Sequence, residues 1–444
     1  MTRYSRLRAI LLAFLLIAWF AATPARAQET MTLTLQRALA LARDNSQRIR
    51  QATADVRRAE LAVREAQYGR LPTLSVDAQY ANNVRTPVIF LPEGSPFGNV
   101  LRIGSRHNFN ASAAASMPIY NARLDRSIEL SKAMENLNEA ILSVTEREVE
   151  IEVQRAYLNG LMTREALAVL RESYETRLRN LELVRALCEE GVSPEYDLIR
   201  TEVQVENIQP EVVRAENDHE GALNYIKLLT GISMETRIEL DGSLEEMYAA
   251  LPEIVVDPDF EQNAGLIQIE AQREIAERQL ALERAAYLPS LSSFGQYTYQ
   301  SQSNHLRVTD YYWVNTAMVG LTLSIPILGP QRGLRVQQAR VDLDKIDMQR
   351  EYLLESIEAE FRTTTNRIAQ VRQTIAAQAR NVEQAERGLN IARVSYENGV
   401  FSVVEVNDAE LALTQARLNQ ATAYYEYVNA VLDLENLLGR SIGS

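Results

Sequence analysis

The sequence is poor in cysteine, proline and glycine. It holds one cysteine in 444 residues, so no disulfide can form within the chain. Thirteen prolines and 18 glycines leave long stretches uninterrupted, and the plentiful Ala, Leu, Glu, Gln and Arg favour long helices. The three histidines lie far apart, and neither a zinc-ligand spacing nor a phosphate-binding glycine loop is present. We therefore expect no cofactor and no bound metal.

The first 27 residues have the pattern of an export signal that is cleaved after transport. Three arginines within the first eight residues precede an apolar run over residues 9–22, and a small-x-small cleavage site occupies residues 25–27. A membrane anchor is the alternative, but the run is short and Thr23-Pro24 follows it. Beyond this segment, no apolar run has the length of a membrane helix.

The charge of the chain is strongly acidic. The formal value is −13, and loss of the four arginines in the export signal makes it −17 for the mature protein. Phosphate backbones require a basic surface, so this balance argues against nucleic acid as a partner.

An internal repeat organises the chain. Four short landmarks recur in the same order in both halves, which predicts two structural repeats at 28–231 and 258–444 joined by a linker at 232–257. The paired landmarks are residues 71–75 and 288–292, 117–119 and 325–327, 190–192 and 398–400, and 229–231 and 437–439.

Each repeat is predicted to begin with a helical segment, at about 34–68 and 258–286, which a Leu-Pro pair ends. Two strands of alternating polarity follow. Leu74 and Val76, for example, share one strand face, whereas the strand near Phe294 alternates only weakly. The alternation fits a barrel with lipid outside and water inside, and it equally fits a soluble sheet packed on a core.

Aromatic residues gather at the loop ends of the second pair of strands: Tyr299, Tyr311, Tyr312 and Trp313. Such rings suit a membrane interface, although ordinary packing would also place them there. The loop at 86–99 in the first pair is rich in proline and glycine, which predicts a surface position.

Long helices are predicted at about 121–190 and 331–398. Each would extend about 100 Å, so each needs partners in a bundle. Gly191 and Gly399 follow these helices and are expected to end them in the left-handed conformation. Ser193-Pro194 is expected to start the next helix as N-cap and first residue, and residues 402–405 form a capping-box pattern.

These features resemble the TolC family of outer-membrane efflux and secretion channels. The segment 396–408 looks like the second-repeat tip of that family, and residues 33–35, 38–39 and Asn45 resemble its mature N-terminus. The resemblance implies a mainly α fold with β. Three protomers would each supply four strands to a twelve-stranded transmembrane β-barrel, and their long helices would continue it as a periplasmic α-barrel.

The resemblance also implies a gate at the two glycine turns. Glu405 and Asp408 would line the pore constriction, although Glu405 could serve only its capping box and Asp408 could lie on a solvated helix face. Asp197 and Tyr396 match positions that link the two hairpins. Phe401 stands where the family's typical member has a basic residue, so closure here would depend more on apolar contact.

The implied function is a homotrimeric exit duct for efflux or secretion. It would be embedded in outer-membrane lipid and would dock to a periplasmic adaptor protein and an inner-membrane pump. A periplasmic coiled-coil scaffold or adaptor with a small β-domain is the alternative. No catalytic constellation supports a secreted enzyme. Cys188 is expected to be a small structural residue near a helix end.

Overall fold

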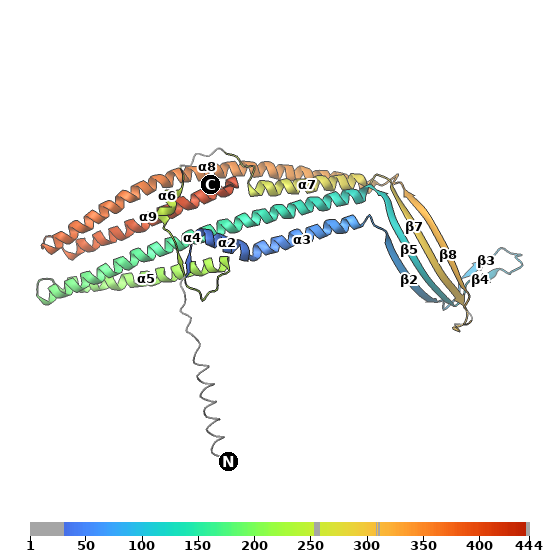
Figure 1. Ribbon diagram of the computed structural model, residues 1–444, viewed down its shortest axis with the longest axis horizontal. Helices are drawn as coiled ribbons and strands as arrows, with labels where there is room; N and C mark the ends of the chain where they lie inside the picture. The colour runs from blue at the N-terminus through green and yellow to red at the C-terminus, as the bar shows by residue number, and fades with distance from the viewer. Residues whose placement is uncertain (1–30, 253–257, 308, 310, 441–444) are drawn as a thin grey trace, which may run out of the picture.

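The computed structural model describes residues 31–252, 258–307, 309 and 311–440, so the predicted export signal lies outside the described residues. Helices occupy one end of the elongated molecule and a curved sheet occupies the other (Figure 1). Among the described residues, no helix combines the length and apolar character needed to cross a membrane.

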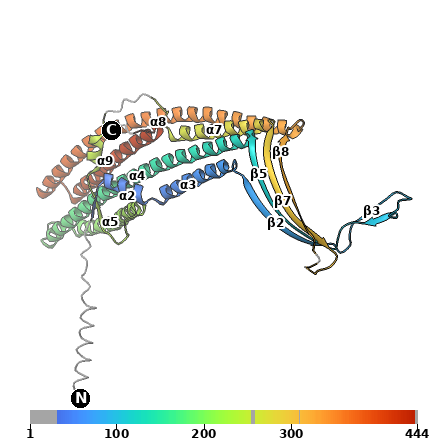
Figure 2. The same cartoon turned by 45° about the vertical axis from the view of Figure 1, so that its right-hand side comes forward.

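Two helices of 68 residues run the length of the helical part, α4 and α8. Two shorter helices lie end to end along each of them, so that each long helix has a packing partner over both of its halves (Figures 1 and 2). The first layer contains α3, α4 and α5, and the second contains α7, α8 and α9. The bounds are α2 Leu35–Asn45, α3 Gln47–Tyr68, α4 Ala122–Glu189, α5 Glu195–Thr230, α7 Ala264–Ala285, α8 Pro330–Glu397 and α9 Val403–Leu438.

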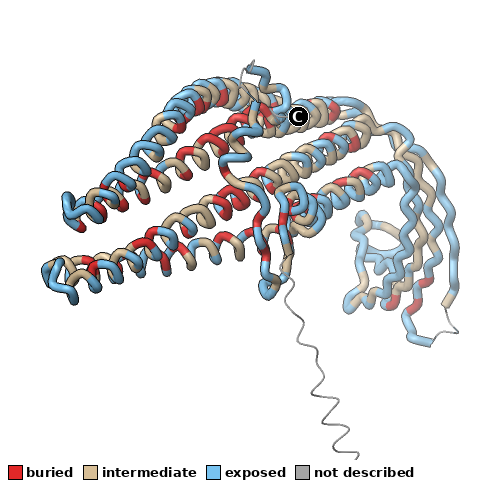
Figure 3. Tube along the Cα trace, turned by 60° about the vertical axis from the view of Figure 1, so that its left-hand side comes forward, coloured by how far each residue is buried: buried red, intermediate tan, exposed pale blue. Residues whose placement is uncertain are grey.

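The largest packed core lies midway along the helices. Tyr157 of α4 is buried there, and its hydroxyl contacts the carbonyl oxygens of Leu33 at 2.9 Å and Asp241 at 2.7 Å. These two residues lie at the ends of β1 (Met31–Leu33) and β6 (Ile238–Leu240), which pair in parallel. Elsewhere the buried residues form narrow stripes along facing helices (Figure 3).

The predicted linker contains regular structure in its described part. It holds β6 and the short helix α6 (Leu244–Ala250), which begins with a capping box between Ser243 and Glu246. The described part of the linker therefore packs against α4 and α9.

The first helical segment of each repeat differs from its predicted bounds. The helix expected over 34–68 is broken at Ser46, whose hydroxyl accepts a hydrogen bond from the Ile49 amide and caps α3. The helix expected from 258 starts six residues later, where Asn263 caps α7. An equivalent long-range hydrogen bond is found at both places. The side-chain amide of Asn45 donates to the Thr230 carbonyl at the end of α5, and that of Asn263 donates to the Leu437 carbonyl near the end of α9.

The sheet joins the two repeats. Four antiparallel strands follow the order β2-β5-β7-β8, and β5 of the first repeat pairs with β7 of the second. The strand predicted near Phe294 is confirmed despite its weak alternation, since β7 runs for 14 residues with a paired neighbour on each side. Backbone pairing on both edges compensates for its irregular polarity. The bounds are β2 Thr73–Asn82, β5 His107–Asn121, β7 Ser290–Ser303 and β8 Trp313–Ser324.

The predicted surface loop after β2 projects beyond the sheet (Figures 1 and 2). It contains two short antiparallel strands, β3 (Val88–Phe90) and β4 (Val100–Arg102), whose residues are all exposed. The predicted surface position of this loop is confirmed. Its two short strands were not predicted from its composition.

Candidate functional site

The sheet has one apolar face and one polar face. Residues that lie opposite each other in antiparallel strands point to the same side of a sheet, so the register assigns each row to a face. One row runs Val76, Ala113, Tyr297 and Ala317 across the four strands. The adjacent row on the opposite face runs Asp77, Ser112, Thr298 and Thr316. The two edge strands, β2 and β8, are almost entirely exposed in a single chain, so the apolar face requires a partner or lipid.

Three of the four aromatics expected at a membrane interface form a cluster on the apolar side, at the end of the sheet far from the helices. Trp313 stacks on Tyr299 with ring centroids 4.7 Å apart, and Tyr311 lies 6.4 Å from Trp313. Tyr312 is 81% exposed and stacks on no other aromatic ring among the described residues. The structure adds two residues of the first repeat that the sequence did not single out, since Phe109 contacts both Tyr311 and Tyr80.

The two glycine turns are closely similar, as predicted. Gly191 and Gly399 have φ values of +73° and +72°. This left-handed conformation is unfavourable for residues with a Cβ atom and is therefore typical of glycine. In each turn, the next amide donates back to a carbonyl five residues earlier at 2.8 Å, from Val192 to Leu187 and from Val400 to Ser395. Both turns lie at the end of the helical part remote from the sheet (Figure 1).

The second hairpin carries the two carboxylates expected at a constriction. Both Glu405 and Asp408 are exposed in the first turns of α9. The capping box is confirmed, because the Ser402 amide donates to Glu405 Oε2 at 3.0 Å. Hydrogen bonding from the Ser402 hydroxyl holds the pKa of Glu405 below its usual value, and the positive charge of Arg200 on α5 adds to this. Both effects favour the ionised form of Glu405.

The first hairpin differs from its prediction at Ser193. Helix α5 starts one residue later than expected, with Pro194 at the N-cap, and no side chain caps its amides. The Ser193 hydroxyl donates instead to Asp197 Oδ2 at 3.4 Å. The expected N-cap role of Ser193 is wrong, because Pro194 keeps an extended backbone (φ −65°, ψ 147°) and itself occupies the N-cap position.

The charge of Asp197 in the first hairpin acts on Tyr396 in the second. Burial raises the pKa of Tyr396, and the negative charge of Asp197 raises it further. The tyrosine also packs beside Leu389, Ala392 and Val406, which join α8 to α9. This packing ties the end of α8 to the start of α9.

Apolar side chains at the turns are mostly open to solvent. Val192 and Val400 are 70% and 73% exposed, while Phe401 is 39% exposed. A single protomer therefore does not bring these three residues into a packed cluster. Cys188 is half-buried one turn before Gly191.

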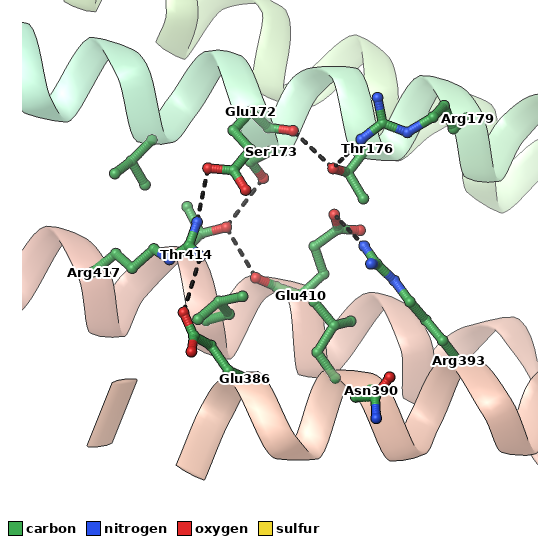
Figure 4. A pocket seen from close by; sticks show the side chains of 13 residues that line it. Glu172, Ser173, Thr176, Arg179, Glu386, Asn390, Arg393, Glu410, Thr414 and Arg417 are labelled. Carbon is green, nitrogen blue, oxygen red and sulfur yellow. Dashed lines mark hydrogen bonds and ion pairs between the residues drawn. The ribbon is translucent and has the colours of Figure 1, made fainter. Parts of the chain in front are cut away.

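A polar cluster that the sequence did not reveal lies farther along the hairpins, where α4, α8 and α9 meet (Figure 4). It surrounds a cavity of about 270 Å³. Arg417 of α9 bridges the two layers, donating to Glu172 of α4 at 2.7 Å and to Glu386 of α8 at 3.0 Å. Thr414 donates to Ser173 of α4 at 3.1 Å.

Glu410 is the buried carboxylate of this cluster and is only 4% exposed. It accepts a hydrogen bond from Asn180 of α4 at 3.2 Å and lies 3.9 Å from the guanidinium of Arg393. Burial raises the pKa of Glu410 despite the positive charges of Arg393, Arg177 and Arg179. In the sequence, the burial of Glu410 is indicated only by its position four residues from both Val406 and Thr414, which places the three on one helix face. That spacing does not distinguish a buried acid from an exposed one.

Known proteins match this chain over most of its length. The family model described as outer membrane efflux protein matches residues 38–232 and 260–440. The chain is 22% identical to the outer membrane protein TolC of Escherichia coli K12, covering 90% of this chain and 80% of that protein. It is 20% identical to the cobalt-zinc-cadmium resistance protein CzcC of Cupriavidus metallidurans, covering 92% and 90%. The crystal structure of VceC from Vibrio cholerae matches with a TM-score of 0.71 at 15% identity, covering 92% of this chain and 96% of that one.

Proposed function

The chain belongs to the outer membrane efflux protein family, and from this premise we propose that three copies assemble into one passive exit duct. The protein lies in the outer membrane, has a long periplasmic helical portion and provides an exit route for efflux. Its relatives are channels of this type and not enzymes. An inner-membrane pump and a periplasmic adaptor would supply the energy and the connection.

The main observation in support of a trimer is that the backbone groups along both edges of the sheet lack hydrogen-bond partners among the described residues. Strands β2 and β8 each have a neighbour on one side within the described chain, so each presents a row of unpaired backbone groups. These groups need partners when they lie in lipid. Pairing β8 of one copy with β2 of the next satisfies them, and three copies close a cylinder of twelve strands with the apolar face outward.

The aromatic cluster sets the depth of this cylinder in the membrane. Tyr299, Tyr311 and Trp313 gather at the end far from the helices, where the outer interface of the membrane would lie. Amphipathic rings prefer the boundary between hydrocarbon and headgroups. Tyr312 extends from the same strand end and fits the same level.

The helical hairpins form the gate of the proposed duct. Three copies would place six carboxylates, from Glu405 and Asp408, around the axis at the periplasmic mouth. Such a ring favours cations and binds multivalent ones. A link between Asp197 and Tyr396, whose pKa the charge of Asp197 raises, would hold the two hairpins of a protomer together. Phe401, with Val192 and Val400, would then meet the neighbouring copy, which accounts for their exposure in one chain.

The double substitution Glu405→Ala with Asp408→Ala tests the constriction. In planar bilayers we expect lower cation selectivity and weaker block by trivalent cations, because the ring loses its charge. The matched control is Glu189→Ala with Glu190→Ala, which removes two exposed carboxylates from the other hairpin at the same end. Equal selectivity in the wild type and the Glu405/Asp408 variant would remove the ring assignment. Full solubility without detergent would instead favour a periplasmic scaffold.

A further inference from the structure

A basic hollow lies at the outer end of the sheet, beneath the projecting β3–β4 hairpin. Its volume is about 820 Å³, and it is lined by the segments that enter and leave that hairpin and by the β7–β8 turn. Three exposed arginines face it, Arg85, Arg102 and Arg106. Asn83, Thr86 and Asn304 contribute polar groups to the same wall.

The three arginines have no counter-charge. Their guanidinium groups make no ion pair and no hydrogen bond within the part of the chain that the structure describes, whereas Arg48, Arg273 and Arg417 each bind two carboxylates. Glu93 is the sole acidic residue between positions 83 and 106. Three unpaired cations concentrated in a chain of net charge −13 create a local positive field that attracts an anion.

Apolar side chains stand directly beside the hollow. Val88 lines it, and Ile89, Phe90 and Val100 on the same short hairpin are exposed, Phe90 by 78%. A lone two-stranded hairpin is marginal in water, so this one needs an apolar cover. The ligand that satisfies both features is an amphiphile with an anionic head.

We propose that the hollow binds the phosphate groups of an anionic lipid of the outer leaflet, with Arg85, Arg102 and Arg106 as donors. The guanidinium fork matches the geometry of phosphate oxygens and can bind them in pairs. The inference rests on the proposed function, which places this end of the sheet at the outer membrane surface. The exposed hairpin then lies against the lipid and fixes the protomer at a defined depth.

Native mass spectrometry of the detergent-purified protein tests the site. The probes are a phosphorylated diglucosamine glycolipid and the same glycolipid without phosphate. We expect the wild type to retain the phosphorylated form at least about tenfold more tightly, the size expected for a few charge-assisted hydrogen bonds. The triple variant Arg85→Ala, Arg102→Ala, Arg106→Ala should lose this preference. The control is Arg64→Ala, Arg335→Ala, Arg340→Ala, three exposed and unpaired arginines of the helical part.

Three results would overturn the inference. They are equal binding of both glycolipids by the wild type, unchanged binding by the triple variant, and full displacement by millimolar inorganic phosphate, which would indicate a site for the free anion. The wild-type comparison requires no substitution, so a folding defect in the variant does not affect it. Absence of trimers in the same spectra would contradict the proposed function, whereas trimers without lipid preference contradict only this inference.

Discussion

At the scale of single residues, α9 carries two carboxylates in opposite environments. Glu410 is buried and its pKa is raised, mainly by burial. Glu405 is exposed and its pKa is lowered, mainly by the Ser402 hydroxyl. A raised carboxyl pKa means that the folded state favours the protonated form, so its stability contribution is complete below the ordinary pKa and is lost as pH rises through the raised value. For Glu405 the contribution is present above the ordinary pKa and is lost as pH falls.

Substituting each acid by glutamine should therefore change the pH profile of stability in opposite directions. Glu410→Gln imitates the protonated side chain and can still accept from Asn180, so the loss of thermal stability as pH rises above the ordinary carboxyl pKa should shrink. Glu405→Gln should weaken stability on the neutral side and leave the acidic side little changed. Circular dichroism melts at several pH values measure both effects. Parallel profiles for the two variants and the wild type would contradict these assignments.

At the scale of elements, the glycine turns end both long helices with similar geometry. Gly399 has a φ of +72°, which an alanine adopts at a cost of about 1–2 kcal/mol. Gly388 lies within α8 at ordinary helical φ, and a Cβ there would meet no atom within 4 Å.

Gly399→Ala should destabilise the second hairpin by about 1–2 kcal/mol, whereas Gly388→Ala should stabilise α8 by about 0.5–1 kcal/mol. Hydrogen exchange of amides around the turn and urea unfolding by circular dichroism measure these changes. The glycine-to-alanine substitution at position 388, within α8, is thus the control for the same substitution at position 399. Destabilisation of equal size at both positions would mean that helix packing, and not the turn conformation, sets the cost.

The elements that could be predicted from the sequence are those that depend on neighbouring residues. The glycine turns, the capping box at Ser402 and the long helices follow from neighbouring residues, and both long helices start and end within one residue of their predicted bounds. The bond from Asn45 to the end of α5, the pairing of β7 with β5 and the buried position of Glu410 depend on partners more than 100 residues away. Periodicity within a segment contains no information about such partners, so these features required the three-dimensional structure.

At the scale of the whole molecule, the two helical layers are joined near the gate by few polar contacts. Arg417 connects α9 to α4 and α8, and Arg155 of α4 pairs with Asp433 of α9 farther along. In the proposed duct, separation of the second hairpin from the first would widen the mouth. The Arg417 bridge opposes that separation.

Arg417→Ala should therefore favour the open mouth. A partly exposed ion pair is worth up to about 1 kcal/mol, which corresponds to roughly a fivefold rise in open probability in single-channel recordings. Arg387→Ala is the matched control, because its ion pair with Glu383 lies within α8 alone. An equal effect of both substitutions would show that the bridge between layers has no special part in gating.

The sidedness of the sheet is the most direct test of the duct itself. In a Cys188→Ala background, which has no other cysteine, Val76→Cys and Asp77→Cys place a thiol on adjacent residues of opposite faces of β2. After reconstitution into liposomes, a charged, membrane-impermeant thiol reagent should label the Asp77→Cys protein in the water-filled interior. It should leave the Val76→Cys protein unlabelled until an apolar reagent is added. Equal labelling of both positions by the charged reagent would contradict the proposed duct.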